Sequence, residues 1–585
     1  MLRPNLEALS RRDPELVQRI CWPVESDHVV IEENGDVIYK LHQGRYRLSL
    51  TADAVARSLP SEAPLGAEIF VFGVGLGEPI EAILSSRPDL RVVAWDRDPW
   101  LVRLALGQND WTAALASGRL RLLLGSDLLE HAAAIATSQA AATPANATAT
   151  TGGQTTGGIT VLHPFLATVY RHDRAWLQAA DGAGARPLAL VCAGGLFTDD
   201  LMVALGKTGF ATYTIDIQRL SREELERTVA RLRPSLIAAI NYAEGLAEFA
   251  AAHGCKLLCW QVDPTTSAPP RATGPTDGAF LFTYRRAQVA ELLAGGFTHV
   301  EYLPLAADLE RRAPVPLTGG ERARYGASVS FVGSSLQPQI AGFRQSFLTT
   351  FAPGRPGAVT EAASLLEEVL AEQRRDFSRF VVAAALERRC PELARTAPEH
   401  LDQLARWAGE IAAAEKRLAY VSRLVRFDVR VWGDEGWRAI AQKDDGDPDS
   451  DSRGAGARHP YRGPAGHGLE LTKIYCASLI NVDIGRVYQD DIVTMRVFDV
   501  LACGGFVLAE RSPALAELFE IGREIDCYAT IDELETKVAQ YLAHPEAARA
   551  IAFRGREAVR RRHDVSARVA HMLAVSGADR RQVGR

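Results

Sequence analysis

Short apolar runs alternate with amphipathic stretches along most of this 585-residue chain, and this alternation constrains the fold more than any other feature. The runs have the length of strands, and the stretches between most of them have helical spacing. Such alternation is typical of parallel sheets with helices on both faces. The sequence therefore predicts an α/β protein with strands at residues 68–77, 91–96, 187–194, 211–217, 235–240, 256–262, 279–284, 299–305, 327–335, 427–433, 480–484 and 506–510.

A low-complexity segment, AAATPANATATTGGQTTGG, interrupts the alternation at residues 140–158. Its small and polar residues cannot fill a core, so it is a linker or a surface insertion. The whole chain is too long for one core. We expect a small Rossmann-like domain, a connector, and two α/β halves, the second of which carries a helical insertion. The predicted boundaries are 1–139, 159–186, 187–320 and 321–585, with the insertion at about 337–421.

Composition and charge exclude several classes of protein. A net charge of −6 gives no global attraction to nucleic acid, and the basic run at residues 554–564 is interpreted as a solvated helix face. No apolar stretch approaches the roughly 18–20 residues that span a bilayer, and the charged start lacks the apolar core of a secretion signal. Eight scattered cysteines contain no Cys-x-x-Cys pair, so we expect reduced thiols. These features predict a soluble, cytoplasmic protein.

The most informative segment lies at residues 472–512, TKIYCASLINVDIGRVYQDDIVTMRVFDVLACGGFVLAERS. A strand runs into a polar loop, and a helix is expected to begin near Ile492. A helix N-terminus suits a diphosphate, and Arg486 and Arg496 could donate bidentate hydrogen bonds to phosphate oxygens. Asp491 and Asp499 would suit sugar or ribose hydroxyls. In the alternative interpretation, Arg496 and Asp499 merely pair along the helix at i, i+3.

This segment resembles the C-terminal half of GT-B glycosyltransferases, and most of all the CgeB-type, or spore-maturation-protein-like, family. Such enzymes carry two acidic residues separated by seven others just before an Ala-Cys-Gly stop, as Asp491 and Asp499 are before Ala502. Aspartate stands here where glutamate is more usual. Earlier pieces agree, including Trp260 and Asp263 in CWQVDP. The resemblance covers residues 187–580 and implies two Rossmann-like domains that face one cleft.

The resemblance also implies a function, that of a metal-independent, hexosyltransferase-like glycosyltransferase that needs no cofactor beyond its nucleotide-sugar donor. Its second carboxylate, Asp499, would hold the ribose, and Asp491 the donor sugar or the helix start. The acceptor base would be Asp263 or, less favourably, His299. The acceptor would be a protein such as flagellin, or a cell-surface glycan. The residues predicted to bind the donor are Gly333, Ser334, Lys473, Arg486, Asp491, Arg496, Asp499, Gly504 and Gly505, with Arg496 also catalytic.

The N-terminal domain leaves a second interpretation open. Its glycine cluster, Gly73-x-Gly75-x-Gly77, is followed by Asp96, a pattern of cofactor-binding βα turns. It would suit an S-adenosylmethionine-dependent methyltransferase, although Val71 stands where such enzymes place an acid. A structural role for these glycines is the other possibility. More loosely, the domain resembles Rossmann-like domains attached to bacterial flagellin-modifying glycosyltransferases.

Three further alternatives follow from the residues alone. Asp96 and Asp98 spell an Asp-x-Asp that could hold a metal ion, but a ribose or capping role suits their place after a strand better. The acidic run at 444–451 alternates like a calcium loop and lacks its glycine and final glutamate, so we interpret it as a solvated loop. Finally, the chain could be a catalytically inactive binding protein with the GT-B shape.

Overall fold

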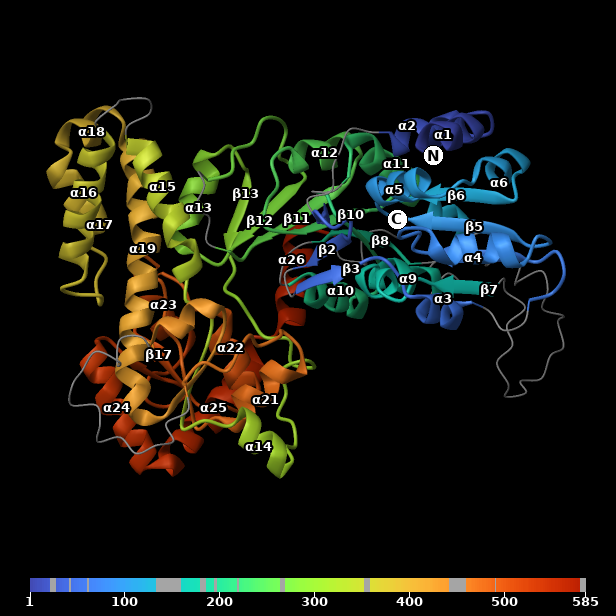
Figure 1. Cartoon of the computed structure of the whole chain (residues 1–585). Helices are drawn as coiled ribbons and strands as arrows, with labels where there is room; N and C mark the ends of the chain where they lie inside the picture. The colour runs from blue at the N-terminus through green and yellow to red at the C-terminus, as the bar shows by residue number, and fades with distance from the viewer. Residues whose placement is uncertain are drawn as a thin grey trace. The chain divides into compact units, whose positions relative to one another are not determined.

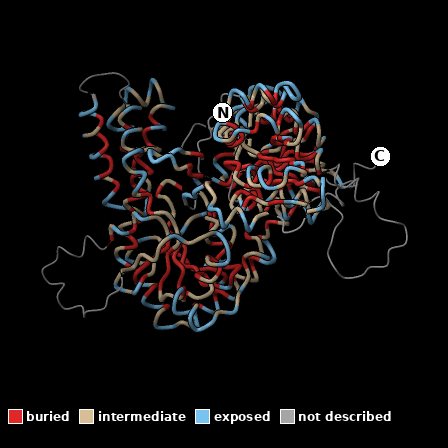
Figure 2. Tube along the Cα trace, turned by 45° about the vertical axis from the view of Figure 1, so that its right-hand side comes forward, coloured by how far each residue is buried: buried red, intermediate tan, exposed pale blue. Residues whose placement is uncertain are grey.

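The computed structural model of the chain has two compact units, Met1–Gly194 with Gly209–Ala238 and Gly195–Thr208 with Ala239–Arg585 (Figure 1). Buried backbone lies in the sheets of each unit (Figure 2). The α/β class predicted from the sequence is confirmed. The predicted linker at 140–158 and the acidic run at 444–451 lie outside the described residues. The structure describes residues 1–21, 28–41, 44–59, 63–132, 159–178, 186–193, 197–217, 220–263, 269–351, 358–440, 459–489 and 491–578.

The first unit contains a four-stranded parallel sheet, in the order β6-β5-β4-β7, and an antiparallel sheet, in the order β1-β2-β3. Only β4 and β5 of these strands are predicted from the sequence. Apolar residues of helices α1, α2, α4 and α5 pack on the parallel sheet. The elements are α1 (Leu2–Ser10), α2 (Pro14–Ile20), β1 (Val29–Ile31), β2 (Val37–Leu41), β3 (Gly44–Arg47), α3 (Ala52–Ser58), β4 (Glu68–Phe72), α4 (Glu78–Ser86), β5 (Arg91–Asp96), α5 (Pro99–Gln108), α6 (Thr112–Ser117), β6 (Leu120–Leu124), β7 (Ile159–Leu162), α8 (Leu166–Val169), α9 (Arg171–Gln178), β8 (Leu188–Cys192), β9 (Ala211–Ile215) and α11 (Arg222–Leu232).

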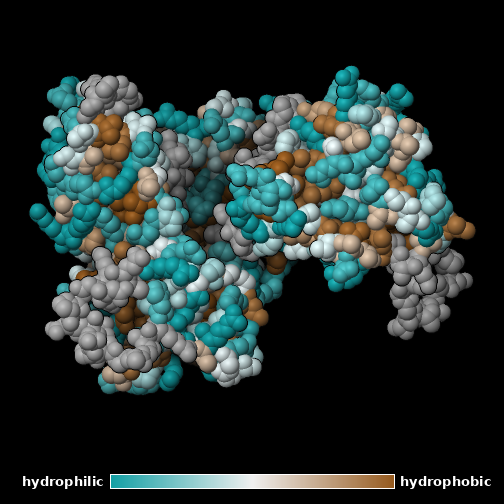
Figure 3. Space-filling view, in the orientation of Figure 1, coloured by the Kyte–Doolittle hydropathy of each residue, from teal (hydrophilic) through white to brown (hydrophobic). Residues whose placement is uncertain are grey.

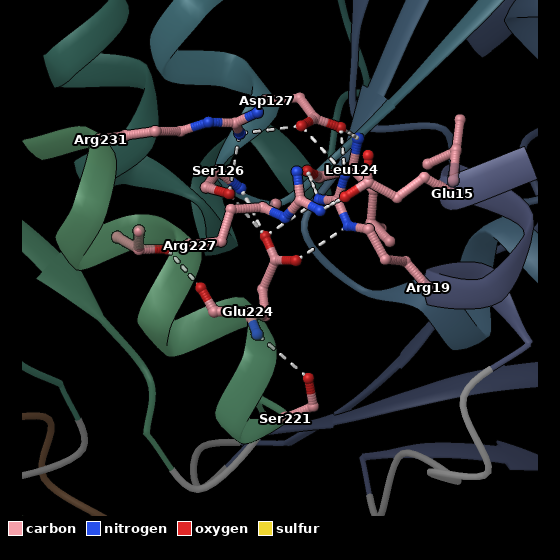
Figure 4. A network of polar contacts seen from close by, with 12 residues as sticks. Glu15, Arg19, Leu124, Ser126, Asp127, Ser221, Glu224, Arg227 and Arg231 are labelled. Atoms are coloured by element: carbon pink, nitrogen blue, oxygen red, sulfur yellow. Dashed lines mark hydrogen bonds and ion pairs between the residues drawn. The ribbon is translucent and has the colours of Figure 1, made fainter. Parts of the chain in front are cut away.

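A network of largely buried charges joins α11 to α2 and to the segment just after β6 (Figure 4). Arg19, at the end of α2, donates to Glu224 of α11 at 3.0 Å and lies 2.9 Å from an oxygen of Asp127. Arg231 donates to the other oxygen of Asp127 at 2.9 Å, and the Ser126 hydroxyl donates to Glu224 at 2.7 Å. Buried ions persist only when they are paired in this way. The first unit thus extends beyond residue 187, where the sequence predicts a domain boundary.

A second sheet has six strands in the order β13-β12-β11-β10-β8-β9, and the boundary between the units falls within β10. Its strands include near-continuous apolar runs, as expected for parallel strands with both faces covered. All six are predicted from the sequence. The remaining elements of this part are α10 (Thr198–Lys207), β10 (Leu236–Ile240), α12 (Leu246–Ala252), β11 (Lys256–Gln261), β12 (Ala279–Thr283), α13 (Arg286–Ala294) and β13 (His299–Tyr302).

A third sheet, in the second unit, has five strands in the order β15-β14-β16-β17-β18, with parallel pairing throughout. Together with the six-stranded sheet it forms the pair of Rossmann-like folds that the GT-B prediction requires. Only β18 is not foreseen from the sequence. Its elements are α14 (Gly319–Tyr325), β14 (Val329–Val332), β15 (Val429–Trp432), α21 (Leu469–Ala477), β16 (Ile480–Val482), α22 (Met495–Ala502), β17 (Val507–Glu510), α23 (Pro513–Leu518), β18 (Asp526–Tyr528), α24 (Ile531–Ala543) and α25 (Pro545–Arg562).

The predicted helical insertion is present between β14 and β15, and its helices lie side by side with a core of their own (Figure 1). The long helix α19 ends directly before the strand that completes the sheet edge, so its last turns lie on the five-stranded fold. Its helices are α15 (Ile340–Phe351), α16 (Ala358–Gln373), α17 (Val382–Arg389), α18 (Pro391–Thr396) and α19 (Pro398–Leu424), with short 3-10 turns at Gln337–Gln339, Val425–Phe427 and Glu435–Arg438.

The last helix, α26 (Val565–Ser576), packs against α10 and β11 of the six-stranded part. Lys256 of β11 donates to the carbonyl oxygen of Ser576 at 2.5 Å, and Arg568 donates to that of Pro304 at 3.0 Å. This return of the chain is not predicted from the sequence. The face in Figure 3 is largely hydrophilic with smaller apolar patches. Among the described residues, no helix has both the length and the apolar character that crossing a membrane requires.

Candidate functional site

Arginines gather at the carboxyl edge of the five-stranded sheet. Arg496, in the first turn of α22, donates from Nε to the carbonyl oxygen of Val332 at 2.6 Å and from Nη1 to Asp483. Arg417, near the end of α19, donates from Nη1 to the carbonyl oxygen of Ser334 at 2.8 Å. Val332 ends β14, and Asp483 follows β16 directly. Both guanidinium groups therefore lie where parallel α/β sheets commonly bind ligands.

Arg417 is the most deeply placed of these arginines, at 9% exposed. Burial, together with the positive charges of Arg496 and Arg486, lowers the pKa of Arg417 to about 9. The group is still protonated at neutral pH. Its Nε has no hydrogen-bond partner within the described part of the chain. Cations held this close to one another favour an anion between them.

Two buried carboxylates lie among the three arginines. Asp483 pairs with Arg496, and Glu410 of α19 has an oxygen 3.2 Å from Nε of Arg486. Three guanidinium groups thus share two carboxylates, which leaves a positive excess of one. Such an excess of preorganised donors suits a diphosphate.

The turn after β14 contributes backbone rather than side chains. A Cβ on Gly333 would lie 2.6 Å from Nη2 of Arg496, so this position has no room for a side chain. The Ser334 hydroxyl donates to Asp434 at 2.7 Å, which stabilises the turn, while its carbonyl oxygen holds Arg417. The predicted Gly333–Ser334 turn therefore does lie beside Arg496.

Asp491 lies in the loop before α22, next to a side chain from the six-stranded part. Arg285, just after β12, donates from Nε to its Oδ1 at 3.0 Å, and both side chains are about four-fifths buried. The neighbouring Tyr284 hydroxyl is buried and has no hydrogen-bond partner among the described residues. Burial raises the pKa of Tyr284, and the charges acting on it include those of Arg285, Asp263, Arg486 and Asp491. These groups surround one polar region.

Asp263 follows the carboxyl end of β11, as predicted, and its side chain is exposed. It accepts a hydrogen bond from Nδ2 of Asn241 at 2.8 Å. Asn241 has a φ of 59° and accepts from the backbone N–H of Val262 at 2.9 Å, so it fixes the loop that carries Asp263. His299 begins β13 at the opposite, amino edge and stacks on Phe280. Of the two proposed acceptor bases, only Asp263 lies at the carboxyl edge.

Helix α22 begins at Met495 rather than near Ile492. Its N-cap residue, Thr494, has an extended backbone and donates from Oγ1 to Asp483 at 2.8 Å instead of capping the helix. The three preceding residues are drawn into the loop that carries Asp491. Asp490 lies outside the described residues.

Asp499 does not pair with Arg496, so the alternative interpretation of an i, i+3 pair is wrong. Its Oδ2 instead accepts from Nε of Arg312 at 2.9 Å, in an ion pair whose side chains are 2% and 6% exposed. Arg312 also donates to the Thr472 hydroxyl at 3.2 Å. Burial raises the pKa of Asp499, and Arg312 opposes that shift. Asp499, which the sequence analysis predicts to bind the ribose, is therefore already paired with another residue of the protein.

Three other residues predicted to bind the donor lie away from the arginines. The Lys473 Nζ pairs with Glu321 of α14 at 2.5 Å. Gly504 and Gly505 end α22 at the amino edge of the sheet, because β17 begins at Val507. A Cβ on Gly505 would lie 2.7 Å from the carbonyl oxygen of Tyr475, so this glycine serves packing.

The glycine cluster of the first unit is filled by the protein itself. A Cβ on Gly75 would lie 2.5 Å from Nε2 of His163, and one on Gly77 would lie 2.6 Å from the Trp111 ring. Asp96 is fully buried and accepts from the Val74 N–H at 2.8 Å and from a tyrosine hydroxyl at 2.7 Å. Burial raises the pKa of Asp96 to about 6. The carboxylate oxygens of Asp96 therefore stabilise the glycine turn and are not available to a ribose.

Asp98 likewise has a structural part. Its Oδ1 accepts from the Trp100 N–H at 2.9 Å and caps α5. Among the described residues, no group of three or more histidine, cysteine, aspartate or glutamate side chains is arranged to hold a metal ion. Independence of metal for the chain's activity stays a prediction.

Comparison with known protein families finds one match, in the C-terminal part of the chain. Residues 411–574 match the family model of glycosyl transferase-like proteins, and this range includes Arg417, Arg486 and Arg496. This region is therefore glycosyltransferase-like. The comparison with curated proteins gave no match.

Solved structures overlap the chain loosely. A sucrose-phosphate synthase from Thermosynechococcus elongatus is 12% identical, with 67% of this chain and 98% of that chain covered and a TM-score of 0.40. HepE from Anabaena, in complex with UDP and glucose, is 10% identical over 67% and 100% of the two chains, with a TM-score of 0.38. A glycosyltransferase from Rickettsia africae is 9% identical over 68% and 100%, with a TM-score of 0.38.

Several site residues are missed by the sequence analysis. Arg417 and Glu410 belong to the helical insertion, and no local pattern indicates that its last helix returns to the sheet edge. Arg285 and Tyr284 follow β12, and their position after a predicted strand is the one signal that could have drawn attention to them.

Proposed function

We propose that the chain is a glycosyltransferase that takes its sugar from a nucleotide-sugar donor. The observation that carries this proposal is the cluster of Arg417, Arg486 and Arg496 at the carboxyl edge of the five-stranded sheet, within the glycosyltransferase-like region. Sugar transfer releases a nucleoside diphosphate. A preorganised positive cluster stabilises the charge that develops on this leaving group.

In this proposal the diphosphate lies against the arginines, with Arg496 as the catalytic donor. The backbone of Gly333 and Ser334 allows its close approach. Arg417 and Arg486 supply further positive charge, and Asp483 fixes the orientation of Arg496. Donors held by other protein groups need no reorganisation during the reaction.

The sugar would lie toward Asp491 and Arg285. The charges of this pair and of the exposed Asp263, the proposed acceptor base, all act on Tyr284. A carboxylate that receives a proton from an acceptor hydroxyl must come within hydrogen-bond reach of it. The exposure of Asp263 leaves room for such an approach.

The ribose role of Asp499 rests on the resemblance alone. One of its oxygens already accepts from Arg312, and the side chain is nearly inaccessible. A ribose hydroxyl would have to reach the other oxygen. The ion pair favours a role for Asp499 in holding the segment around Arg312 in place.

The acceptor proposed from the sequence, a protein such as flagellin or a cell-surface glycan, rests on the resemblance. The methyltransferase alternative loses support because His163 and Trp111 fill the glycine cluster. The inactive-protein alternative predicts donor binding without turnover, so it differs from our proposal in one measurable outcome.

The proposal is tested by incubating the whole protein with a panel of nucleotide sugars and measuring release of the nucleoside diphosphate. We expect slow hydrolysis, or transfer to an added acceptor, with at least one donor. The control is the Arg496→Met variant, which should bind less donor and turn over more slowly. Absence of release with every donor, despite tight binding, would favour the inactive-protein alternative.

A second arm of this assay concerns metal ions. Arginines that already neutralise a diphosphate make a divalent cation unnecessary, so activity should survive excess chelator. A strict requirement for added Mn²⁺ or Mg²⁺ would contradict this part of the proposal.

A further inference from the structure

A cavity of about 540 Å³ lies at the amino edge of the five-stranded sheet, in the second unit. Its lining includes residues just before strands, among them Ala327, Asp428, Leu479 and Phe506. Because the strands are parallel, this edge is opposite to the one that carries Arg417 and Arg496. The proposed donor site does not account for this cavity.

Four arginines line this cavity or the one that adjoins it. Arg322 of α14, Arg430 of β15 and Arg549 of α25 line the first, and Arg556 of α25 lines the second (Figure 1 labels both helices). Within the described residues, none of the four has an ion pair with a carboxylate, although Asp428 also lines the first cavity. Arg430 donates to a backbone carbonyl oxygen at 3.0 Å. In a chain with net charge −6, four unpaired arginines at one place indicate a site for an anion.

Unpartnered polar atoms also occur at this place. The Ser478 hydroxyl lines the first cavity, is in a residue 7% exposed, and has no hydrogen-bond partner among the described residues. The Nε atoms of Arg430 and Arg556 likewise have no hydrogen-bond partner among the described residues. Buried polar groups in folded proteins nearly always have partners, so a bound ligand would satisfy an otherwise costly arrangement.

The adjoining cavity, of about 340 Å³, has apolar residues as well as arginines in its lining. Its lining includes Pro314, Val315, Leu317 and Phe553, and Phe553 is 67% exposed. An exposed phenylalanine beside arginines on one helix face is a suitable surface for an apolar or aromatic group. The two cavities share the residues Arg322, Cys476, Gly504 and Arg549.

We propose that the two cavities form one binding site for a small molecule that carries phosphate at one end and an apolar or aromatic group at the other. Arg322, Arg430 and Arg549 bind the phosphate, and Phe553 contacts the apolar group. The cavity volumes are in the range of small-molecule sites, about 300–1,000 Å³. Nucleotides and prenyl phosphates both have this chemistry. The site is separate from the proposed donor site.

Cys476 provides a reporter because it lines both cavities. Its Sγ lies 3.4 Å from the carbonyl oxygen of Cys503, and the hydrogen bond with the Cys503 side chain, together with the charge of Arg556, lowers the pKa of the Cys476 thiol. A lowered pKa makes a thiol react faster with alkylating reagents. Cys21, which is exposed in the other unit, is an internal control.

The test is the rate of iodoacetamide alkylation at Cys476 in the whole protein, measured by peptide mass spectrometry. UDP, geranyl pyrophosphate and inorganic pyrophosphate are the three probes. At ten times its Kd, a bound probe should slow alkylation of Cys476 about tenfold and leave Cys21 unchanged. Protection by UDP identifies a nucleotide site, and protection by geranyl pyrophosphate identifies a prenyl phosphate site. Equal protection by inorganic pyrophosphate, or no protection by any probe, would overturn the proposal.

Variants separate this site from the donor site. Arg430→Gln and Arg549→Gln should each weaken the protection, whereas Arg560→Gln, an exposed arginine of α25 paired with Glu557, should not. Protection should persist in Arg417→Met. Loss of protection in Arg417→Met alone would mean that the effect is transmitted from the donor site, which contradicts a separate site.

Discussion

The Nη1 of Arg417 donates to the carbonyl oxygen of Ser334 at 2.8 Å, and this bond joins the helical insertion to the turn after β14. A segment that is an addition to the Rossmann-like fold therefore supplies a charge to the proposed diphosphate site. Removing the guanidinium group of Arg417 tests whether the insertion is part of that site.

Arg417→Met should weaken binding of nucleoside diphosphate about 10- to 150-fold, the equivalent of about 1.5–3 kcal/mol for a hydrogen bond to a charged group. Isothermal calorimetry measures the affinity, and circular dichroism verifies the fold. Arg395→Met is the matched control, since Arg395 is an exposed arginine of the same insertion. Unchanged affinity in a folded Arg417→Met protein would remove Arg417 from the site.

Asp491→Asn should slow sugar transfer and leave affinity for the nucleoside diphosphate nearly unchanged, because Asp491 lies against Arg285 rather than among the other arginines. The expected loss in kcat/KM is about 10- to 100-fold, from one charged hydrogen bond. Glu517→Gln is the control, as it removes a comparable but exposed pair with Arg286 at 2.6 Å. An equal loss of diphosphate affinity would place Asp491 at the phosphates instead.

The Arg312–Asp499 pair predicts a loss of stability. Arg312→Met leaves Asp499 buried without its partner. The free energy of unfolding, measured in urea, should therefore fall by about 3–5 kcal/mol. Arg312→Met combined with Asp499→Leu should recover part of that loss, because both charges are then gone. If Asp499→Asn instead reduces nucleotide affinity and leaves the urea midpoint unchanged, the ribose role is correct and the structural role is not.

Deletion of residues 1–186 should destabilise what remains, because it removes Arg19 and Asp127 from the network around Glu224 and Arg231. A plain truncation at 187 is therefore expected to expose a carboxylate that is buried in the whole chain. The midpoint of the thermal transition of the 187–585 fragment measures this loss of stability. Glu224→Gln within the fragment should partly restore the stability. A fragment as stable as the whole chain would show that the network contributes nothing.

Stability should fall on the acid side because His563 is buried in its neutral form. Burial, with the charge of Arg568, lowers the pKa of His563 from 6.5 to about 4. The unfolded chain takes up this proton below pH 6.5, and the folded chain does so only near pH 4. The free energy of unfolding therefore drops as pH falls through this range, by about 2 kcal/mol between pH 7 and pH 5.

Urea unfolding at both pH values checks this effect. His563→Gln should show a smaller drop than the wild type, and His544→Gln, which alters an exposed histidine, should show the same drop as the wild type. If His563→Gln retains the full pH dependence, other groups cause it.

Much of the fold is predictable because strand-length apolar runs mark parallel strands wherever both faces are covered. Each of the strands expected after residue 187 is present. The short strand β18 and the antiparallel strands β1 to β3 escape the sequence analysis; β18 (DCY) and β3 (GRYR), for example, contain charged residues and form no apolar run. The return of α26 to β11 depends on tertiary packing that no local pattern reveals.

The candidate site is predictable where backbone position alone decides it. Arg496, Gly333 and Asp491 all lie beside strand ends, and strand ends can be recognised in the sequence. Gly504 shows the limit of this reasoning, because a motif that is contiguous in sequence runs from one edge of the sheet to the other along α22. Arg417 shows the converse, that residues distant in sequence can lie at one site. It is about 70 residues or more along the chain from every predicted donor-binding residue of the C-terminal motif except Lys473.

The most direct measurement is a calorimetric titration of the whole protein with nucleotide sugars, and separately with S-adenosylmethionine, in excess chelator. We predict saturable binding of at least one nucleotide sugar that is weakened in Arg417→Met and in Arg496→Met, and no binding of S-adenosylmethionine. Binding of S-adenosylmethionine that is lost in Asp96→Ala, without binding of any nucleotide sugar, would contradict the proposal that this chain is a glycosyltransferase.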